Sequence, residues 1–122
     1  MQQHLDRMLA DERSDAFVES FVWSWLHLKN SVAMAPDLMK FPDYHRNRIN
    51  EAMLQETYTF FRHALTENLP LSTFLDSDFA FVNSNLARHY GLNQKVSTTV
   101  QFQKVSFASS VHRGGLLGQA SV

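Results

Sequence analysis

Apolar residues follow a helical period near the start of the chain. Six of them fall on one helical face: Phe17, Val18, Phe21, Val22, Trp25 and Leu28. Trp23 and Leu26 lie off this face, so the pattern predicts a central helix packed on two sides. A shorter helix is predicted within residues 1–11, and its inward positions would be Leu5, Met8 and Leu9.

The longest helical pattern runs from Tyr44 to Glu67. Its inward positions are Ile49, Met53, Leu54, Thr57, Phe60, Phe61, Ala64 and Leu65. Asn68 and Pro70 end this helix. Two more helices are predicted, a short one over residues 71–76 and another over residues 83–90. Gly91 stands where a helix C-terminus favours a left-handed residue.

The period changes after residue 91. Apolar and polar residues alternate from 96 to 102, and apolar residues recur in the opposite phase at 105 and 107, which indicates β structure with a bulge or a change of partner. Residues 112–122 are rich in glycine and show neither period. The predicted fold is mainly α: four to five helices forming a compact bundle, with a short β hairpin or strand near the C-terminus.

Composition narrows the class of protein. The chain has 122 residues, of which 44% are hydrophobic, enough for one domain. Its formal net charge is −1 and it has no basic stripe, so we expect no nucleic acid partner. The most apolar stretch, residues 21–28, is too short to cross a bilayer, so we expect no membrane insertion. The absence of cysteine excludes thiol nucleophiles, thiolate zinc sites and covalent haem attachment within this segment.

Glu56 is the first candidate for chemistry. Together with His63, two turns later on the same predicted helix, it could supply an acid and a base or part of a metal site. Alternatively, Glu56 is a structural anchor that forms a hydrogen bond to Asn83, to Tyr90 or to a backbone N–H. The sequence leaves both interpretations open.

The densest polar cluster lies between residues 76 and 90. Asp76 and Asp78 could offer oxygen ligands to a cation, but the glycine and the closing glutamate of a calcium loop are missing. Asn83 and His89 do not share a helical face, which weakens the interpretation of the cluster as one site. The alternative is that Asp76, Asp78 and Asn83 form turns and caps. The six histidines form no zinc motif.

Residues 113–115 offer another pair of alternatives. Backbone N–H groups at Arg113, Gly114 and Gly115 could bind an anion. A turn that requires positive φ explains the same glycines.

Several motifs resemble those of a known family. They are Phe17–Leu28, Pro36-Asp37 with Phe41-Pro42, Met53–Thr57 with Phe60-Phe61, Asp78–Asn83, Leu86–Gly91 and Arg113–Leu117. The chain resembles the planctomycete-type domain of unknown function found in large exported proteins that also carry c-type cytochrome domains. Family members usually have threonine where Ala80 and Gly118 stand here.

The resemblance implies a division of the chain and a setting for it. Residues 1–111 would form the helical domain with its β element, and residues 112–122 would be the truncated start of a following domain. The parent protein would be extracytoplasmic, with its export signal and its haem c in other domains and no cofactor in this segment. Residues 1–13 themselves carry no export signal.

The expected function is therefore a non-catalytic structural or interaction module. Its partners would be neighbouring domains of the same polypeptide, and Trp23, off the apolar face of its helix, is the best candidate for a contact with them. Glu56, Asn83, Tyr90 and Arg113 would have structural or interaction roles. The alternative is a helical catalytic domain, a hydrolase or a redox-coupled enzyme, in which Glu56 acts with Asp78 or His89 and with residues outside this segment.

Overall fold

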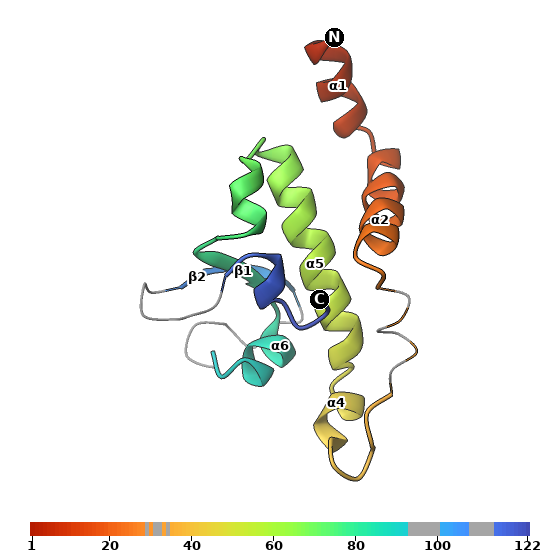
Figure 1. Ribbon diagram of the computed structural model, residues 1–122, viewed down its shortest axis with the longest axis vertical. Coiled ribbons are helices and arrows are strands. Elements are labelled where there is room, and N and C mark those ends of the chain that lie inside the picture. Colours follow the sequence, from red (N-terminus) through yellow and green to blue (C-terminus); the bar gives the residue numbers. More distant parts are fainter. Residues whose placement is uncertain (29, 31–32, 34, 93–100, 108–113) are drawn as a thin grey trace.

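The structure is a computed structural model that describes residues 1–28, 30, 33, 35–92, 101–107 and 114–122. Figure 1 shows its elements in chain order: α1 (Gln2–Leu9), α2 (Arg13–Trp25), α4 (Pro42–Arg46), α5 (Ile49–Thr66), the 3₁₀ turn η1 (Leu71–Phe74), β1 (Phe79–Val82), α6 (Ser84–His89), β2 (Gln103–Ser106) and the 3₁₀ turn η2 (Leu116–Gly118). The predicted mainly α fold is confirmed. Within the described residues, no helix is long and apolar enough to span a membrane.

The β element is a two-stranded antiparallel sheet in which Phe79 pairs with Ser106 and Val82 with Gln103. Strand β2 falls where β structure was predicted, whereas the alternating residues 96–100 lie outside the described part of the chain. Strand β1 was not predicted. Its four residues are all apolar, so they show no alternation that would distinguish a strand from a buried helical turn.

Helix α5 is the central element. It packs against α2 on one side and against β1 and α6 on the other (Figure 1). Three apolar clusters surround it: Val18, Val22, Leu28 and Phe61 toward α2; Phe60, Phe79 and Leu116 toward β1 and η2; Ala52, Ala80, Val82, Leu86, Ala87 and Val105 toward the sheet and α6. Helices α2, α4 and α6 and strand β1 are therefore positioned by their contacts with one long helix.

The single long helix predicted over residues 44–67 is wrong at its start. Helix α4 ends at Arg46, and α5 begins only at Ile49. Arg48 between them has φ +49°, in the left-handed region that an α-helix cannot continue through. The predicted end is confirmed, since Asn68 also has positive φ and its neighbour Leu69 donates to the Ala64 carbonyl.

The prediction that the helix carrying the apolar face from Phe17 to Leu28 is central is also wrong. Val18 and Val22 are buried, but Phe17 is 56% exposed and Trp25 is 47% exposed. The reason is that α2 packs against α5 along a single strip, and no described element covers its outer side.

Helix α1 forms where it was predicted, but two of its three predicted inward side chains are exposed. Leu5 is 51% exposed and Met8 is 63% exposed. Figure 1 shows α1 extending past the start of α2, away from the rest of the molecule, so it has no core to point toward.

Candidate functional site

The three candidate catalytic residues lie apart from one another. Glu56 is buried at the middle of α5, His89 is exposed at the end of α6, and Asp78 is exposed just before β1. Each borders a different hollow: about 10 Å³ beside Glu56, about 320 Å³ beside Asp78 and about 390 Å³ beside His89. A shared acid and base site would need two of these groups around one space. Among the described residues, none of these three hollows is bordered by two of the candidate groups.

Glu56 is held by the hydroxyl of Tyr90. The Glu56 side chain is 1% exposed, and Tyr90 Oη donates to its Oε2 at 2.6 Å. The same hydroxyl accepts a hydrogen bond from the backbone N–H of Ala120 at 2.9 Å. Tyr90 is one of the partners predicted for Glu56 as a structural anchor, and the predicted bond is present.

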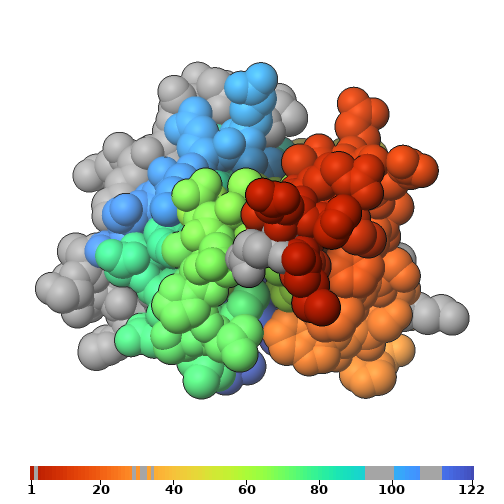
Figure 2. All heavy atoms as spheres, turned by 90° about the horizontal axis from the view of Figure 1, so that it is seen from above, coloured from red at the N-terminus to blue at the C-terminus, as the bar shows by residue number. Residues whose placement is uncertain are grey.

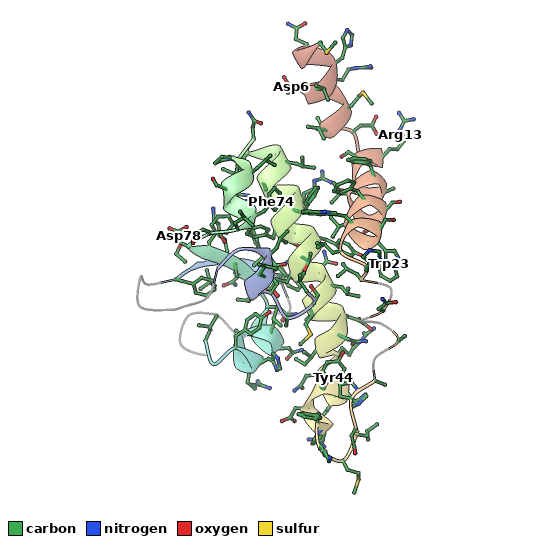
Figure 3. All side chains as sticks on the ribbon, viewed as in Figure 1. Asp6, Arg13, Trp23, Tyr44, Phe74 and Asp78 are labelled. Carbon is green, nitrogen blue, oxygen red and sulfur yellow. The ribbon has the colours of Figure 1, made fainter. Side chains whose placement is uncertain are left out.

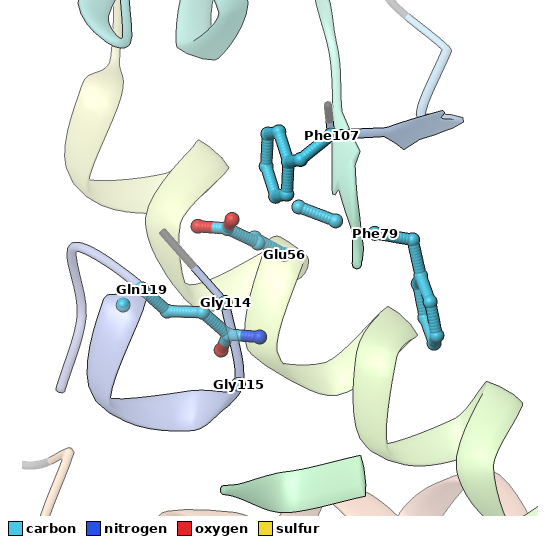
Figure 4. A pocket seen from close by; sticks show the side chains of 8 residues that line it. Glu56, Phe79, Phe107, Gly114, Gly115 and Gln119 are labelled. Atoms are coloured by element: carbon cyan, nitrogen blue, oxygen red, sulfur yellow. The ribbon is translucent and has the colours of Figure 1, made fainter. Parts of the chain in front are cut away.

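The space beside Glu56 is too small for a substrate. Figure 4 shows the carboxylate between Phe107 and the C-terminal segment, with Gly114, Gly115 and Gln119 closing the other side. A volume of about 10 Å³ is close to the about 10–15 Å³ that one water molecule requires. The site can hold a water, and it cannot admit an organic substrate without a rearrangement.

Thr57 forms a second polar contact with the same C-terminal segment. Its Oγ1 donates to Gln119 Oε1 at 2.7 Å and lies 2.5 Å from Ser121 Oγ. Thr57 is fully buried and Gln119 nearly so. Because buried polar groups are costly unless paired, these bonds fix the segment at one position on α5.

The glycines of the Arg113-Gly-Gly motif allow a close backbone approach. A Cβ at Gly114 would lie 2.2 Å from the Ser77 carbonyl oxygen, and one at Gly115 would lie 2.4 Å from the Leu75 carbonyl oxygen. Gly115 also has φ +65°, and its N–H donates to Ser77 Oγ. The interpretation as a turn that needs positive φ is confirmed at Gly115. Arg113 lies outside the described residues.

Asn83 is a helix cap. Its side-chain oxygen accepts from the N–H of Leu86 at 2.9 Å at the start of α6, as the capping alternative predicted. Asp76 and Asp78 border the hollow of about 320 Å³ together with Ser77, whose hydroxyl is already bonded to Gly115 and to the Phe79 carbonyl. Within the described residues, no three His, Asp or Glu side chains gather closely enough to hold a metal ion.

Trp23 is partly buried against the cluster of Val18, Val22, Leu28 and Phe61. Figure 3 shows it at the end of α2, on the opposite side of α5 from Asp78. Its proposed contact with another domain stays a prediction. Trp25, which was predicted to be inward, is the more exposed of the two tryptophans.

The model of a family described as a protein of unknown function (PSD4, DUF1592) matches residues 1–92. The chain belongs to this family. No curated protein and no solved structure matches it.

The DUF1592 match includes both members of the buried pair, Glu56 and Tyr90, and the Asn83 cap. The residues that cover Glu56 from the other side, Gly114 to Gln119, lie beyond the matched range. In this chain, the two stretches nevertheless form one packed unit, because Leu116 is buried between Phe60 and Phe79.

His63 has a role that sequence reasoning missed. Its ring packs edge-on against Phe79 and Phe81, and its Nε2 lies 3.1 Å from Lys104 Nζ on β2. Burial lowers the pKa of His63, the Lys104 charge lowers it further, and Glu67 acts in the opposite direction. The only sequence signal was a histidine at the edge of the apolar face of α5.

We predict that Tyr90→Phe lowers the free energy of unfolding by about 1–3 kcal/mol, because the buried Glu56 carboxylate loses the hydrogen bond from the Tyr90 hydroxyl and the Ala120 N–H loses its bond to the same hydroxyl. Urea unfolding measures the loss. Tyr44→Phe is the matched control, since no hydrogen bond from its hydroxyl is found among the described residues, and it should change the value by less than about 0.5 kcal/mol. Equal losses in the two variants would show that the Glu56–Tyr90 bond contributes nothing specific.

We also predict a pH dependence from His63. Its pKa is below 6.5 in the folded state, so the unfolded chain binds this proton more readily. Stability from this group is complete above about pH 6.5 and is lost as the pH falls toward the folded-state pKa. Lys104→Gln should raise the His63 pKa, measured by NMR titration, and should reduce the loss. Lys40→Gln is the control. It removes a lysine that borders the hollow beside His89 and should leave the His63 titration unchanged. An unchanged titration in Lys104→Gln would refute the assigned cause.

Proposed function

We propose that this DUF1592 domain is a non-catalytic structural or interaction module. The observation that carries the proposal is the environment of Glu56: a fully buried carboxylate, bonded to Tyr90, beside a space of about 10 Å³. A general acid or base must reach the proton that it transfers. A group in this position stabilises the fold instead.

The exposed aromatic residues of α2 support the interaction role. Phe17, Phe21 and Trp25 are each between 42% and 56% exposed and stack along the helix, with ring centroids 6.0 Å and 5.6 Å apart. Aromatic residues are enriched at the centres of protein interfaces, where they contribute large areas at low entropic cost. A contiguous aromatic row of this size is unusual on a surface that contacts only water.

The catalytic alternative, with Glu56 acting together with Asp78 or His89, would require two changes. The C-terminal segment would have to leave Glu56, and one of the other two residues would have to cross to a different hollow. No observation favours either movement.

The proposed setting is a larger exported protein of planctomycete type that also carries c-type cytochrome domains, with the neighbouring domains as partners. The resemblance of the Phe17–Leu28 and Leu86–Gly91 motifs supports this setting. The haem c would be bound elsewhere in the parent, because covalent haem attachment requires cysteines and this segment has none.

The catalytic question is tested with generic substrates. We expect the chain to hydrolyse p-nitrophenyl acetate and p-nitrophenyl phosphate no faster than buffer, because Glu56 cannot reach them. The same assay is run on Glu56→Gln and on Glu51→Gln, an exposed position of the same helix. Comparison of the two variants distinguishes activity of this chain from activity of contaminating enzymes. A turnover that Glu51→Gln keeps and Glu56→Gln loses would overturn the non-catalytic proposal.

The setting is tested by the complete gene and by cell fractionation. We expect the gene to encode an export signal and at least one Cys-x-x-Cys-His motif outside these 122 residues, and the product to be found outside the cytoplasm. A gene product without a haem motif would refute the cytochrome association and leave the interaction role to be judged separately.

A further inference from the structure

The turn immediately before α4 presents apolar side chains to solvent. Leu38 is 64% exposed, Met39 is 90% exposed and Phe41 is 56% exposed. We call these three residues the apolar tip. In Figure 1 the loop that carries them forms one end of the longest axis of the molecule. Single exposed apolar residues are ordinary, whereas apolar residues gathered at a projecting end mark a site of contact.

The tip is held in shape by its own turn. Asp37 Oδ1 accepts a hydrogen bond from the N–H of Met39 at 2.8 Å, and the Asp37 carbonyl accepts one from the N–H of Phe41 at 2.9 Å. The loop is also attached to α4, since His45 Nε2 lies 2.8 Å from the Pro36 carbonyl oxygen. Binding through this turn therefore costs little ordering of the backbone.

Basic and amphipathic side chains lie at the tip and directly behind it. Lys40 is exposed within the turn itself, and Arg46 is exposed at the end of α4. Figure 3 labels Tyr44 on α4, on the inner side of the turn. Asp43 opposes the two cations, whereas the Asp37 carboxylate is taken up by the turn. The charge next to the tip is therefore positive, although the chain as a whole carries −1.

The hollow of about 390 Å³ lies at the base of the tip. Phe41, Tyr44 and Met53 supply apolar walls to it, and Lys40 and His89 border it as well. Lysine and histidine side chains can both donate hydrogen bonds to phosphate oxygens. An apolar hollow with such donors beside it is suited to the head group of an anionic lipid.

The order of these layers favours a bilayer over a protein as the partner. Apolar side chains come first, followed by a tyrosine and basic groups, which is the order in which acyl chains and head groups follow one another. Lys40 fits this arrangement, because its long stem can lie beside acyl chains while its ammonium reaches the phosphates. A standard protein interface takes about 20–30 residues from each side, whereas the tip is a single turn.

We propose that the apolar tip attaches this domain to the surface of an anionic lipid bilayer. Leu38, Met39 and Phe41 lie at the level of the upper acyl chains, and Lys40 lies at the phosphates. The contact is interfacial and requires no helix that crosses the bilayer, and none is found among the described residues. This inference goes beyond the proposed function, because its partner is a lipid surface and not a neighbouring domain.

The attachment is tested by co-sedimentation of the chain with vesicles of phosphatidylcholine that contain about 30% phosphatidylserine. Wild type should bind them, and Leu38→Gln/Met39→Gln should bind about tenfold more weakly or worse, because two apolar side chains no longer leave water.

Leu71→Gln/Leu75→Gln is the matched control. These two leucines are 81% and 73% exposed, so the control makes the same chemical change without altering charge. They belong to η1 and its C-terminal cap, at the opposite end of the molecule, which Figure 2 shows from above with η1 in green. The control should bind within about twofold of wild type. Circular dichroism establishes that each variant is folded.

The role of charge is tested separately. Lys40→Gln should weaken binding to the anionic vesicles by about fivefold at low salt, and vesicles of phosphatidylcholine alone should bind wild type more weakly. Arg7→Gln removes an exposed cation from α1, at the other end of the chain's long axis, and should leave binding within about twofold.

A second measurement identifies the contact itself. The chain has no cysteine, so Met39→Cys and Leu71→Cys each provide a single position for an environment-sensitive fluorophore. With anionic vesicles, emission from position 39 should shift to the blue and should be quenched by spin-labelled lipid. Emission from position 71 should stay that of a label in water.

Several results would overturn the attachment: a wild-type chain that binds no vesicle, equal binding to neutral and anionic vesicles, equal losses in the two leucine-containing pairs, or a label at position 39 that stays in water. The first result would leave the tip to a protein partner. None of them would touch the proposed non-catalytic role, which is decided by the Glu56-dependent assay. Conversely, a Glu56-dependent turnover would overturn that role whether or not the chain binds lipid.

Discussion

The burial of the Glu56 carboxylate is the constraint on which most of this structure depends. A charged or polar group without a partner in a dry interior costs several kcal/mol, so the fold has to bring a donor to it. One such donor, the Tyr90 hydroxyl, lies 34 residues away at the end of α6. The pair therefore fixes the position of α6 on α5, and with it the strand β1 that leads into α6. An apolar residue at position 56 would avoid the free-energy cost of burying a carboxylate. It would also remove the hydrogen bond that fixes the position of α6 on α5.

The C-terminal residues complete this arrangement. Thr57 follows Glu56 directly and is also buried, and its partners Gln119 and Ser121 come from the same segment that closes the space beside the carboxylate. Ser77 holds the other end of the segment through the N–H of Gly115. Two buried polar residues on one turn of α5 thus explain why an irregular stretch is held in place.

Local rules predicted the features that depend on nearby residues. The Asn83 cap, the end of α5 at Asn68 and the exclusion of His89 from the Asn83 face all follow from positions a few residues apart. The possible hydrogen-bond donors to Glu56 could also be limited in advance to Asn83, Tyr90 or a backbone N–H, because a carboxylate beside an apolar helical face must find a donor on a neighbouring element.

The remaining features depend on tertiary contacts that no local pattern encodes. Gln119 carries no signal that it pairs with Thr57, which lies 62 residues earlier. The left-handed Arg48 interrupts a helical pattern that is otherwise continuous, and arginine is not a residue that favours this conformation. The exposure of Phe17, Phe21 and Trp25 on α2 was not predicted, because an exposed aromatic face and a core-facing one have the same sequence pattern. Only the number of elements packed around the helix distinguishes the two.

The hydroxyl of Tyr90 links two hydrogen bonds in a chain, because it accepts one and donates the other. The Ala120 N–H donates to it, and it donates in turn to Glu56, so each bond polarises the next and both are stronger together than apart. Opening of the C-terminal segment therefore weakens the attachment of α6, and opening of α6 weakens the segment. In terms of local unfolding, two stretches separated by more than twenty residues of chain behave as one cooperative unit.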